Sequence, residues 1–140
     1  HDYQKLANTH HNRSINRHRW QEKALAAALS DDSLHHGKVL STLKYLLNIR
    51  ISQAAFHPNA TQFTLHLGLQ LFGFWRQSKN RAQSIFCISN ISDQPIELPL
   101  SELNLIVTNN WIELISNTKI TDLTETIVLT PYQTVWISNS

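Results

Sequence analysis

The clearest pattern along the chain is an apolar repeat with spacings of three and four over residues 38–54. Such a repeat places one apolar stripe along an α-helix. Polar residues such as Lys44 and Asn48 fall on the opposite side of that helix. The pattern therefore predicts a long amphipathic helix whose stripe must pack against another element. The stripe consists of Val39, Leu40, Leu43, Leu46, Leu47, Ile51 and Ala54.

A shorter helix is predicted immediately before the long one. It runs from Trp20 to Leu29 and is rich in alanine, which favours helix. The segment Asp31-Asp32-Ser33 breaks this helix and offers a cap for the next. Because the short helix can cover only part of the apolar stripe, the stripe predicts a further packing partner.

Beyond Asn59 the pattern changes to an alternation with a period of two, which indicates β-strands. Short stretches of this kind follow one another at regular spacing without intervening helices. They predict an antiparallel β-sandwich of about seven or eight strands. The predicted strands are 62–68, 71–75, 84–91, 96–100, 103–107, 111–115, 127–129 and 134–137.

The two patterns meet in the segment Phe56–Asn59, where Pro58 disfavours helix in the residue before it. We therefore predict a mostly β fold with two N-terminal helices. The helices belong to residues 1–58, and the antiparallel β-sandwich belongs to residues 59–140.

Composition and charge exclude several classes of protein. The 140 residues carry a formal net charge of +2, with 41% hydrophobic and 16% charged residues, as in an ordinary globular domain. A charge this small gives no basic field for general nucleic-acid binding, and no apolar run approaches the ~20 residues of a membrane span. We expect neither nucleic acid nor membrane as a partner. The single cysteine, Cys87, is predicted to be a buried, inert thiol.

Candidate catalytic and metal-binding groups are sparse. The adjacent acids Asp31-Asp32 are interpreted as a helix cap, and acids such as Glu113 and Asp122 as surface charge near turns. Histidine is in excess, but neighbours in the doublets His10-His11 and His35-His36 cannot both direct a nitrogen at one ion, and no acid or cysteine completes a set. No nucleophile motif is present. The residues therefore predict no metal, no cofactor and no catalytic group.

One polar segment stands apart from the rest. Residues 12–20 hold three arginines, two asparagines and a tryptophan without any acid. A guanidinium group presents a planar fork of donors that fits carboxylates and vicinal hydroxyls. The same segment would also suit a phosphate- or RNA-binding patch, or a loop without a ligand. The residues alone leave these alternatives open.

Several segments together resemble the C-terminal region of sucrose-phosphorylase-like enzymes, which belong to glycoside hydrolase family 13 of the α-amylase superfamily. The resemblance spans essentially the whole chain and is generic beyond Asn90. Its most specific parts are Arg13-Ser14-Ile15-Asn16-Arg17 and Phe72-Gly73-Phe74-Trp75-Arg76, supported by Trp20, the helix end near Ile49-Arg50 and the junction His57-Pro58-Asn59-Ala60-Thr61.

The resemblance implies an architecture for both halves. Residues 1–58 would be the last loop and the closing helix of a (β/α)8 barrel, and residues 59–140 the C-terminal β-sandwich. The stripe on 38–54 would then pack on the remainder of the barrel.

Because the chain has no methionine, even at position 1, we expect it to be a piece of a longer protein. We expect a cytoplasmic location and self-association of the chain when it is separated from the barrel.

The resemblance also implies site residues. An arginine of this loop, paired with an aspartate, lines the glucosyl-binding subsite in the family, and the motif match gives that role to Arg17, with Arg13 as second choice. The family's catalytic carboxylates lie upstream, so the chain alone is expected to be inactive. Its parent would be a retaining enzyme that transfers a glucosyl group from an α-glucoside to phosphate, water or an alcohol. Ser14 and the run His18-Arg19-Trp20 differ from sucrose phosphorylases and favour a sister phosphorylase or an α-glucosidase.

A different class of function remains as the alternative, namely a stand-alone β-sandwich module that binds carbohydrate or protein. Carbohydrate-binding modules stack sugar rings on exposed aromatic side chains. Trp111 and Tyr132 lie near predicted turns and are the candidates for such a platform, whereas Trp75 lies in an apolar strand and is expected in the core.

Overall fold

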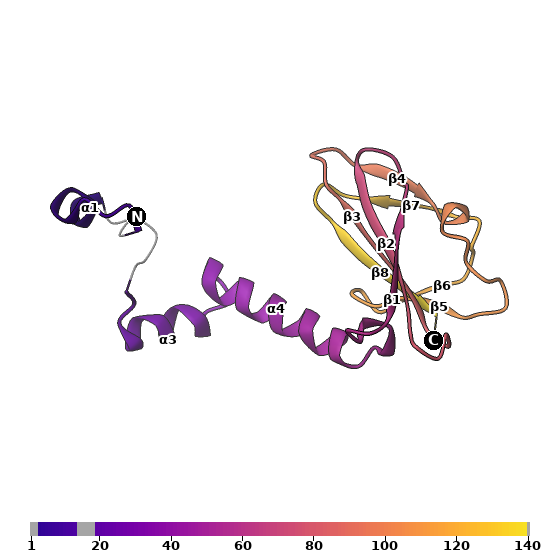
Figure 1. Cartoon of the computed structure of the whole chain (residues 1–140), viewed down its shortest axis with the longest axis horizontal. Helices are drawn as coiled ribbons and strands as arrows, with labels where there is room; N and C mark the ends of the chain where they lie inside the picture. The colour runs from indigo at the N-terminus through magenta and orange to yellow at the C-terminus, as the bar shows by residue number, and fades with distance from the viewer. Residues whose placement is uncertain (1–2, 14–18, 140) are drawn as a thin grey trace. The chain divides into compact units, whose positions relative to one another are not determined.

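The computed structural model describes residues 3–13 and 19–139. The chain divides into two compact units, His1–Tyr45 and Leu46–Ser140, and the division falls inside the long helix. The helices are α1 (Tyr3–Thr9), α3 (Glu22–Ser30) and α4 (His35–Ile51), followed by the short 3₁₀ helix η1 (Ala54–Phe56) (Figure 1). The assignment of residues 1–58 to a barrel stays a prediction.

The two predicted helices are present with shifted ends. α3 begins at Glu22 rather than Trp20, and α4 ends at Ile51 rather than at residue 54. The predicted break at Asp31-Asp32-Ser33 is confirmed, but Asp31 stabilises the turn rather than capping α4: its Oδ1 accepts hydrogen bonds from Ser33 N at 2.9 Å and Ser33 Oγ at 2.6 Å, and α4 begins only at His35. These bonds to the charged form lower the pKa of Asp31. The short helix α1 was not predicted, since its sequence carries no amphipathic repeat.

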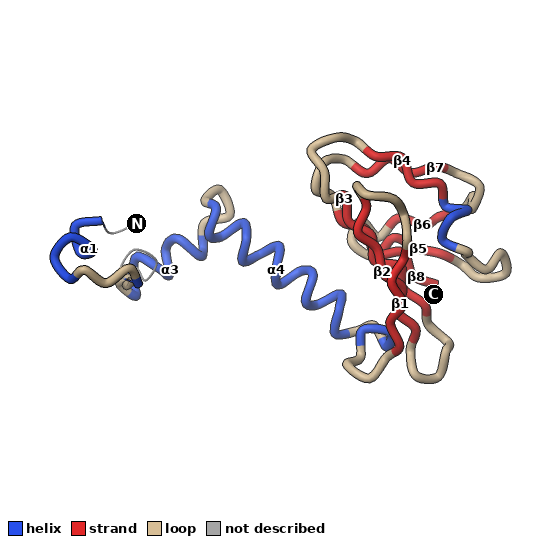
Figure 2. Tube along the Cα trace, turned by 45° about the horizontal axis from the view of Figure 1, so that its top comes forward, coloured by secondary structure: helices blue, strands red, loops and turns tan. Residues whose placement is uncertain are grey.

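The C-terminal part is an antiparallel β-sandwich, as predicted. One sheet has the strand order β1-β2-β3-β8-β5-β6, and the other pairs β4 with β7 (Figures 1 and 2). The two sheets pack on each other because side chains alternate along a strand, so that each sheet turns rows of apolar residues toward the opposite sheet. The strands are β1 (Thr61–Leu65), β2 (Leu71–Gln77), β3 (Ser84–Asn90), β4 (Ile96–Pro99), β5 (Trp111–Glu113), β6 (Thr118–Ile120), β7 (Thr126–Leu129) and β8 (Thr134–Asn139).

Two strand predictions were wrong. The predicted strand 103–107 is absent, since Leu100–Leu103 forms the 3₁₀ helix η2 and Asn104 then adopts a left-handed φ of 52°. Only Leu103 of this stretch is buried, whereas Ile106 and Val107 are exposed, so the alternation does not reflect a strand with one buried face. β6 was missed because only one of its three residues, Ile120, is apolar.

The main core lies between the two sheets. Leu98 of β4 and Leu129 of β7 are buried against Ile88 of β3 and Ile137 of β8. The buried amide of Asn90 closes one end of the sandwich, because its Nδ2 donates to the carbonyl oxygens of Gln94, Leu129 and Thr130 at 2.7, 3.1 and 3.0 Å.

A second apolar cluster covers the outer face of the six-stranded sheet. Phe74, Cys87 and Trp136 form one row across β2, β3 and β8, and η1 lays Ala55 and Phe56 over this row. The predicted burial of Cys87 is confirmed, and desolvation raises the pKa of its thiol to about 12 despite the opposing charge of Arg76. The thiol is therefore protonated and unreactive at neutral pH.

Candidate functional site

The connection between α4 and the sandwich is held by one arginine of β2. Arg76 donates through Nε to the carbonyl oxygen of Ala55 at 2.8 Å and through Nη2 to that of His57 at 2.8 Å. Its Nη1 donates to Gln62 Oε1 at 3.0 Å on the neighbouring strand β1. The planar fork thus ties the segment after α4 to two strands at once.

Gln83 fixes the same segment from the start of β3. Its Oε1 accepts a hydrogen bond from Ala55 N at 2.9 Å, and its Nε2 donates to Gln53 Oε1 at 2.6 Å. Phe56 completes the contact with an edge-to-face packing on Trp136, at 5.0 Å between ring centroids. The segment after α4 therefore has a defined position on the outer face of the sheet. The role of Gln83 was not predicted, because no local sequence pattern indicates it. Arg76 was named only as part of the motif that resembles sucrose-phosphorylase-like enzymes.

Part of the apolar stripe of α4 is exposed within the described residues. Four of its members recur at intervals of four along the helix, and each is between 45% and 76% exposed. We call this set the α4 apolar row; it consists of Val39, Leu43, Leu47 and Ile51. Exposed aliphatic side chains that neighbour one another along a helix are typical of a surface that packs against a partner.

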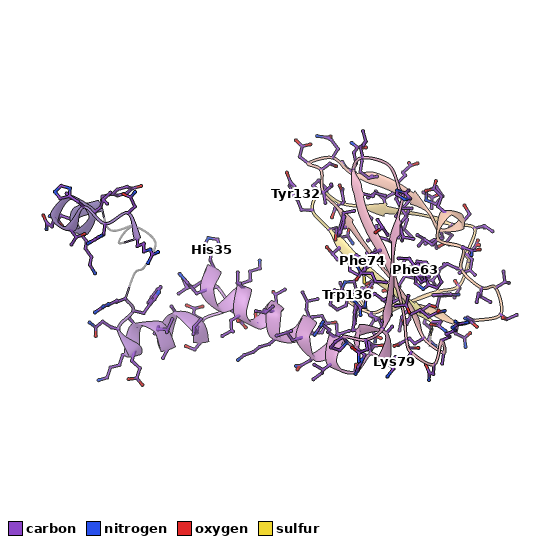
Figure 3. All side chains as sticks on the ribbon, viewed as in Figure 1. His35, Phe63, Phe74, Lys79, Tyr132 and Trp136 are labelled. Atoms are coloured by element: carbon purple, nitrogen blue, oxygen red, sulfur yellow. The ribbon has the colours of Figure 1, made fainter. Side chains whose placement is uncertain are left out.

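A further apolar surface lies on the outer face of the sheet. Phe72 is exposed and packs against Phe74, with 5.9 Å between ring centroids. Phe74 and Trp136 project from neighbouring parts of the sheet (Figure 3). This surface continues the cluster that Phe56 covers, so the outer face is only partly enclosed.

Of the two predicted sugar-binding arginines, the structure describes only Arg13. Arg17 lies outside the described residues. Arg13 is exposed and makes no hydrogen bond to any residue in the ranges 3–13 and 19–139. A role for either residue in a glucosyl subsite stays a prediction.

The aromatic platform predicted for a stand-alone module is partly wrong. Trp111 is only 3% exposed, because its ring packs into the main core and its Nε1 donates to the carbonyl oxygen of Ile106 at 3.0 Å. Tyr132 is 71% exposed, as expected. Trp75 packs on the main core between Phe63 and Phe86, as predicted, with centroid distances of 4.7 and 5.8 Å.

One acid was misinterpreted as surface charge. Glu113 is half-buried and accepts hydrogen bonds from the backbone N–H groups of Ile115, Ser116 and Trp136 at 3.0, 2.6 and 2.9 Å. It therefore closes the β5–β6 turn and joins it to β8.

In the part of the chain that the structure describes, no group of three or more His, Cys, Asp or Glu side chains could hold a metal ion. Within the same ranges, no helix has the length and apolarity to cross a membrane.

Comparison with known proteins shows the family to which this chain belongs. Residues 65–136 match the family described as "Maltogenic Amylase, C-terminal domain". A glucosylglycerate phosphorylase from Allomeiothermus silvanus is 31% identical over 125 residues, which are 89% of this chain and 20% of that protein. The chain thus spans about a fifth of the length of that relative.

Solved structures support the same fold. The crystal structure of AmyP in complex with maltose matches 74% of this chain and 20% of its own chain, with a TM-score of 0.60 and 11% identity. AmyP E221Q in complex with maltotriose matches with a TM-score of 0.58 and 10% identity, over 74% of this chain and 21% of its own. At this level of identity the likeness concerns the fold alone.

The sandwich and its matches define a C-terminal region of an α-amylase-type enzyme. The chain belongs to the maltogenic amylase C-terminal domain family, within glycoside hydrolase family 13. The family expected from the sequence is therefore confirmed.

Proposed function

We propose that the chain is the C-terminal region of a retaining α-glucosyl-transferring enzyme, either a sugar phosphorylase or an α-glucosidase. The observation that carries this proposal is the exposed α4 apolar row, on a helix followed by a segment that Arg76 and Gln83 hydrogen-bond to the sandwich. The identity to a phosphorylase over 89% of the chain supports the choice of enzyme class.

The α4 apolar row supplies the physical reason for a barrel partner. Burying an exposed aliphatic side chain contributes roughly 1–2 kcal/mol when about half of its surface leaves water. Four such side chains therefore contribute on the order of 4–8 kcal/mol if a barrel covers them. The sandwich then acts as a support, because its Arg76 holds the segment that follows the closing helix.

The chemistry would be shared between this chain and the remainder of the enzyme. The catalytic carboxylates would lie outside these residues, and the parent would transfer the glucosyl group from an α-glucoside to phosphate, water or an alcohol. Arg17, with Arg13 as second choice, would donate hydrogen bonds to sugar hydroxyls, and pairing with a carboxylate would keep the guanidinium ordered. We propose a cytoplasmic location for this enzyme.

The test is reconstitution of activity from two pieces. The chain is mixed with a separately expressed barrel fragment of the parent enzyme, and turnover of glucosylglycerate and other α-glucosides is measured with and without phosphate. We expect turnover only in the mixture, and dependence on phosphate identifies a phosphorylase. The Arg17→Lys chain should form the same complex but raise KM or lower kcat. A well-formed complex without turnover on any α-glucoside would contradict the proposal.

A further inference from the structure

A row of stacked aromatic rings crosses three strands of the six-stranded sheet and ends at its open edge. Phe86 of β3 stacks on Trp75 of β2 with 5.8 Å between ring centroids, and Trp75 stacks on Phe63 of β1 at 4.7 Å. Phe86 is buried, whereas Phe63 is 44% exposed (Figure 3). Among the described residues, β1 pairs only with β2. The last ring of the row therefore lies at an edge where a further strand can be added.

The open edge of β1 also presents backbone groups. The hydrogen bond from Ile91 N to Gln70 O, at 2.9 Å, sets the phase of the alternating pattern along β2. In that phase, the backbone N–H and C=O groups of Phe63 face β2. Because this direction alternates along a strand, the N–H and C=O groups of Gln62 and Thr64 face away from β2. These groups are placed to bond to a strand that lies alongside β1.

β1 lacks the features by which natural sheets protect an open edge. Such edges usually carry a charged side chain, a proline or a bulge, or are very short. β1 (Thr61–Leu65) has five residues without a charge, a proline or a glycine. The other strands with an open edge differ from it, since β6 contains Lys119, β4 contains Glu97 and Pro99, and β7 directly follows Glu125. Within the described sandwich, the edge of β1 is therefore the most open to a further strand.

We propose that β1 pairs with β1 of a second copy of this chain, antiparallel and centred on Phe63. In this register Gln62 lies opposite Thr64 of the second copy, and the outward backbone groups exchange four hydrogen bonds across a two-fold axis. Phe63 then faces its own copy in a non-hydrogen-bonded pair, where side chains approach most closely. The row of aromatic rings continues from one copy into the other, and the two six-stranded sheets become one.

A second copy is the fitting partner because β1 is complementary to itself. With Phe63 on the axis, Thr61 faces Leu65 of the second copy at both ends, and no like charges meet. The exposed ring of Phe63 gains a second aromatic ring, and such pairs contribute more than their buried area alone. β1 shares no residue with the α4 apolar row, and the proposal does not depend on a barrel or on catalysis.

The experiment uses the 140-residue chain with Leu43→Glu and Leu47→Glu, which removes association through the α4 apolar row. Sedimentation from about 10 µM to about 1 mM should show a monomer–dimer equilibrium with a Kd on the order of 100 µM. Over the same range, hydrogen exchange of the Gln62 and Thr64 amides should slow about fourfold, as the monomer fraction falls. The amide of Phe63 faces β2 and should change by less than about twofold.

Two variants locate the dimer contact at β1. Thr64→Pro removes an outward N–H and leaves the bonds of β1 to β2 in place, and Phe63→Lys brings two like charges together on the axis. Each should raise the Kd of the dimer at least about tenfold. Val128→Lys is the matched control, because it places the same cation at an exposed apolar position of β7, and the Kd should stay within about twofold.

Four results would overturn the proposal. The first is a chain that stays monomeric at every concentration, including one whose β1 amides gain protection only when a barrel fragment is added. The second is a dimer in which the Gln62 and Thr64 amides stay unprotected, because its contact would lie elsewhere. The third is protection of these amides at every concentration, since another part of the same chain would then cover the edge. The fourth is a dimer that Val128→Lys weakens as much as Phe63→Lys.

Discussion

Replacing Arg76 by methionine should destabilise the sandwich unit, because three hydrogen bonds converge on this guanidinium group. The bond to Ala55 O is the most costly to lose, since Ala55 is fully buried and its carbonyl oxygen would lose this partner. The bond to His57 O lies nearer the surface, and the bond to Gln62 Oε1 is exposed and contributes little. Counting about 1–1.5 kcal/mol for each of the first two bonds, we expect a loss of about 2–3 kcal/mol.

The assay is urea unfolding of the chain, followed by tryptophan fluorescence and evaluated as the free energy of unfolding. Lys79→Met is the matched control, because it removes a cation from the exposed β2–β3 turn and should change stability by less than about 0.5 kcal/mol. Arg76→Lys keeps the charge but loses the fork, so it should recover less than half of the loss. If Arg76→Met and Lys79→Met are equally stable, the junction is not held by this side chain.

Three further predictions follow from other parts of the molecule. Gly37→Ala would push a methyl group into the backbone carbonyl of Asp31, so hydrogen exchange at the α3–α4 turn should accelerate. Folding raises the pKa of Cys87 from 9.0 to about 12, so between these pH values the thiol ionises in the unfolded chain but not in the folded one. The free energy of unfolding should therefore fall as pH rises from about 9 to 12, by at most about 1.4 kcal/mol per pH unit. Cys87→Ala should lack this part of the pH dependence in urea unfolding, and the same pH dependence in Cys87→Ala and the unaltered chain would contradict the prediction. Leu43→Glu with Leu47→Glu should abolish self-association through the α4 apolar row, so that no species larger than a dimer remains in sedimentation, without lowering the stability of the sandwich.

The sequence predicts a helix or strand correctly where the pattern of that element's own residues determines its structure. The repeat of α4 was found because apolar residues recur along one side of the helix, and β2 and β3 were found because apolar residues on both of their faces form short apolar runs. The end of α4 was misplaced because contacts distant in sequence determine it. Residues Arg76 and Gln83 hold the chain after Ile51 in a different conformation.

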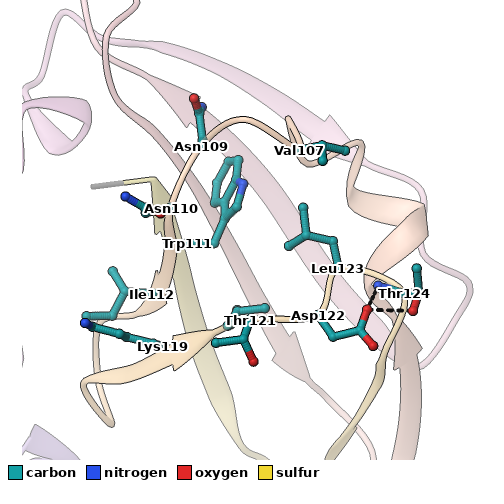
Figure 4. Close-up of a pocket in the computed structure, with 11 residues that line it drawn as sticks. Val107, Asn109, Asn110, Trp111, Ile112, Lys119, Thr121, Asp122, Leu123 and Thr124 are labelled. Atoms are coloured by element: carbon teal, nitrogen blue, oxygen red, sulfur yellow. Dashed lines mark hydrogen bonds between the residues drawn. The ribbon is translucent and has the colours of Figure 1, made fainter.

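Contacts between residues distant in sequence also explain the errors in the candidate sites. Trp111 was expected at the surface because it follows a turn, yet its ring fills the core between the sheets. The pocket beside it (Figure 4) could not be predicted, since it forms where residues 107–110 and 121–124 come together from separate loops. Asp122 was correctly expected near a turn, where its Oδ1 accepts hydrogen bonds from Thr124 N and Thr124 Oγ1.

The most direct test of the account is hydrogen exchange of the chain before and after addition of the barrel fragment. In the free chain, amides of residues 38–51 should exchange much faster than those of β2, β3 and β8, because the α4 apolar row is uncovered. On addition of the barrel fragment, exchange over 38–51 should slow strongly, whereas residues 107–124 should change little. Unchanged exchange along α4 in the presence of a folded barrel fragment would contradict the claim that this helix closes a barrel.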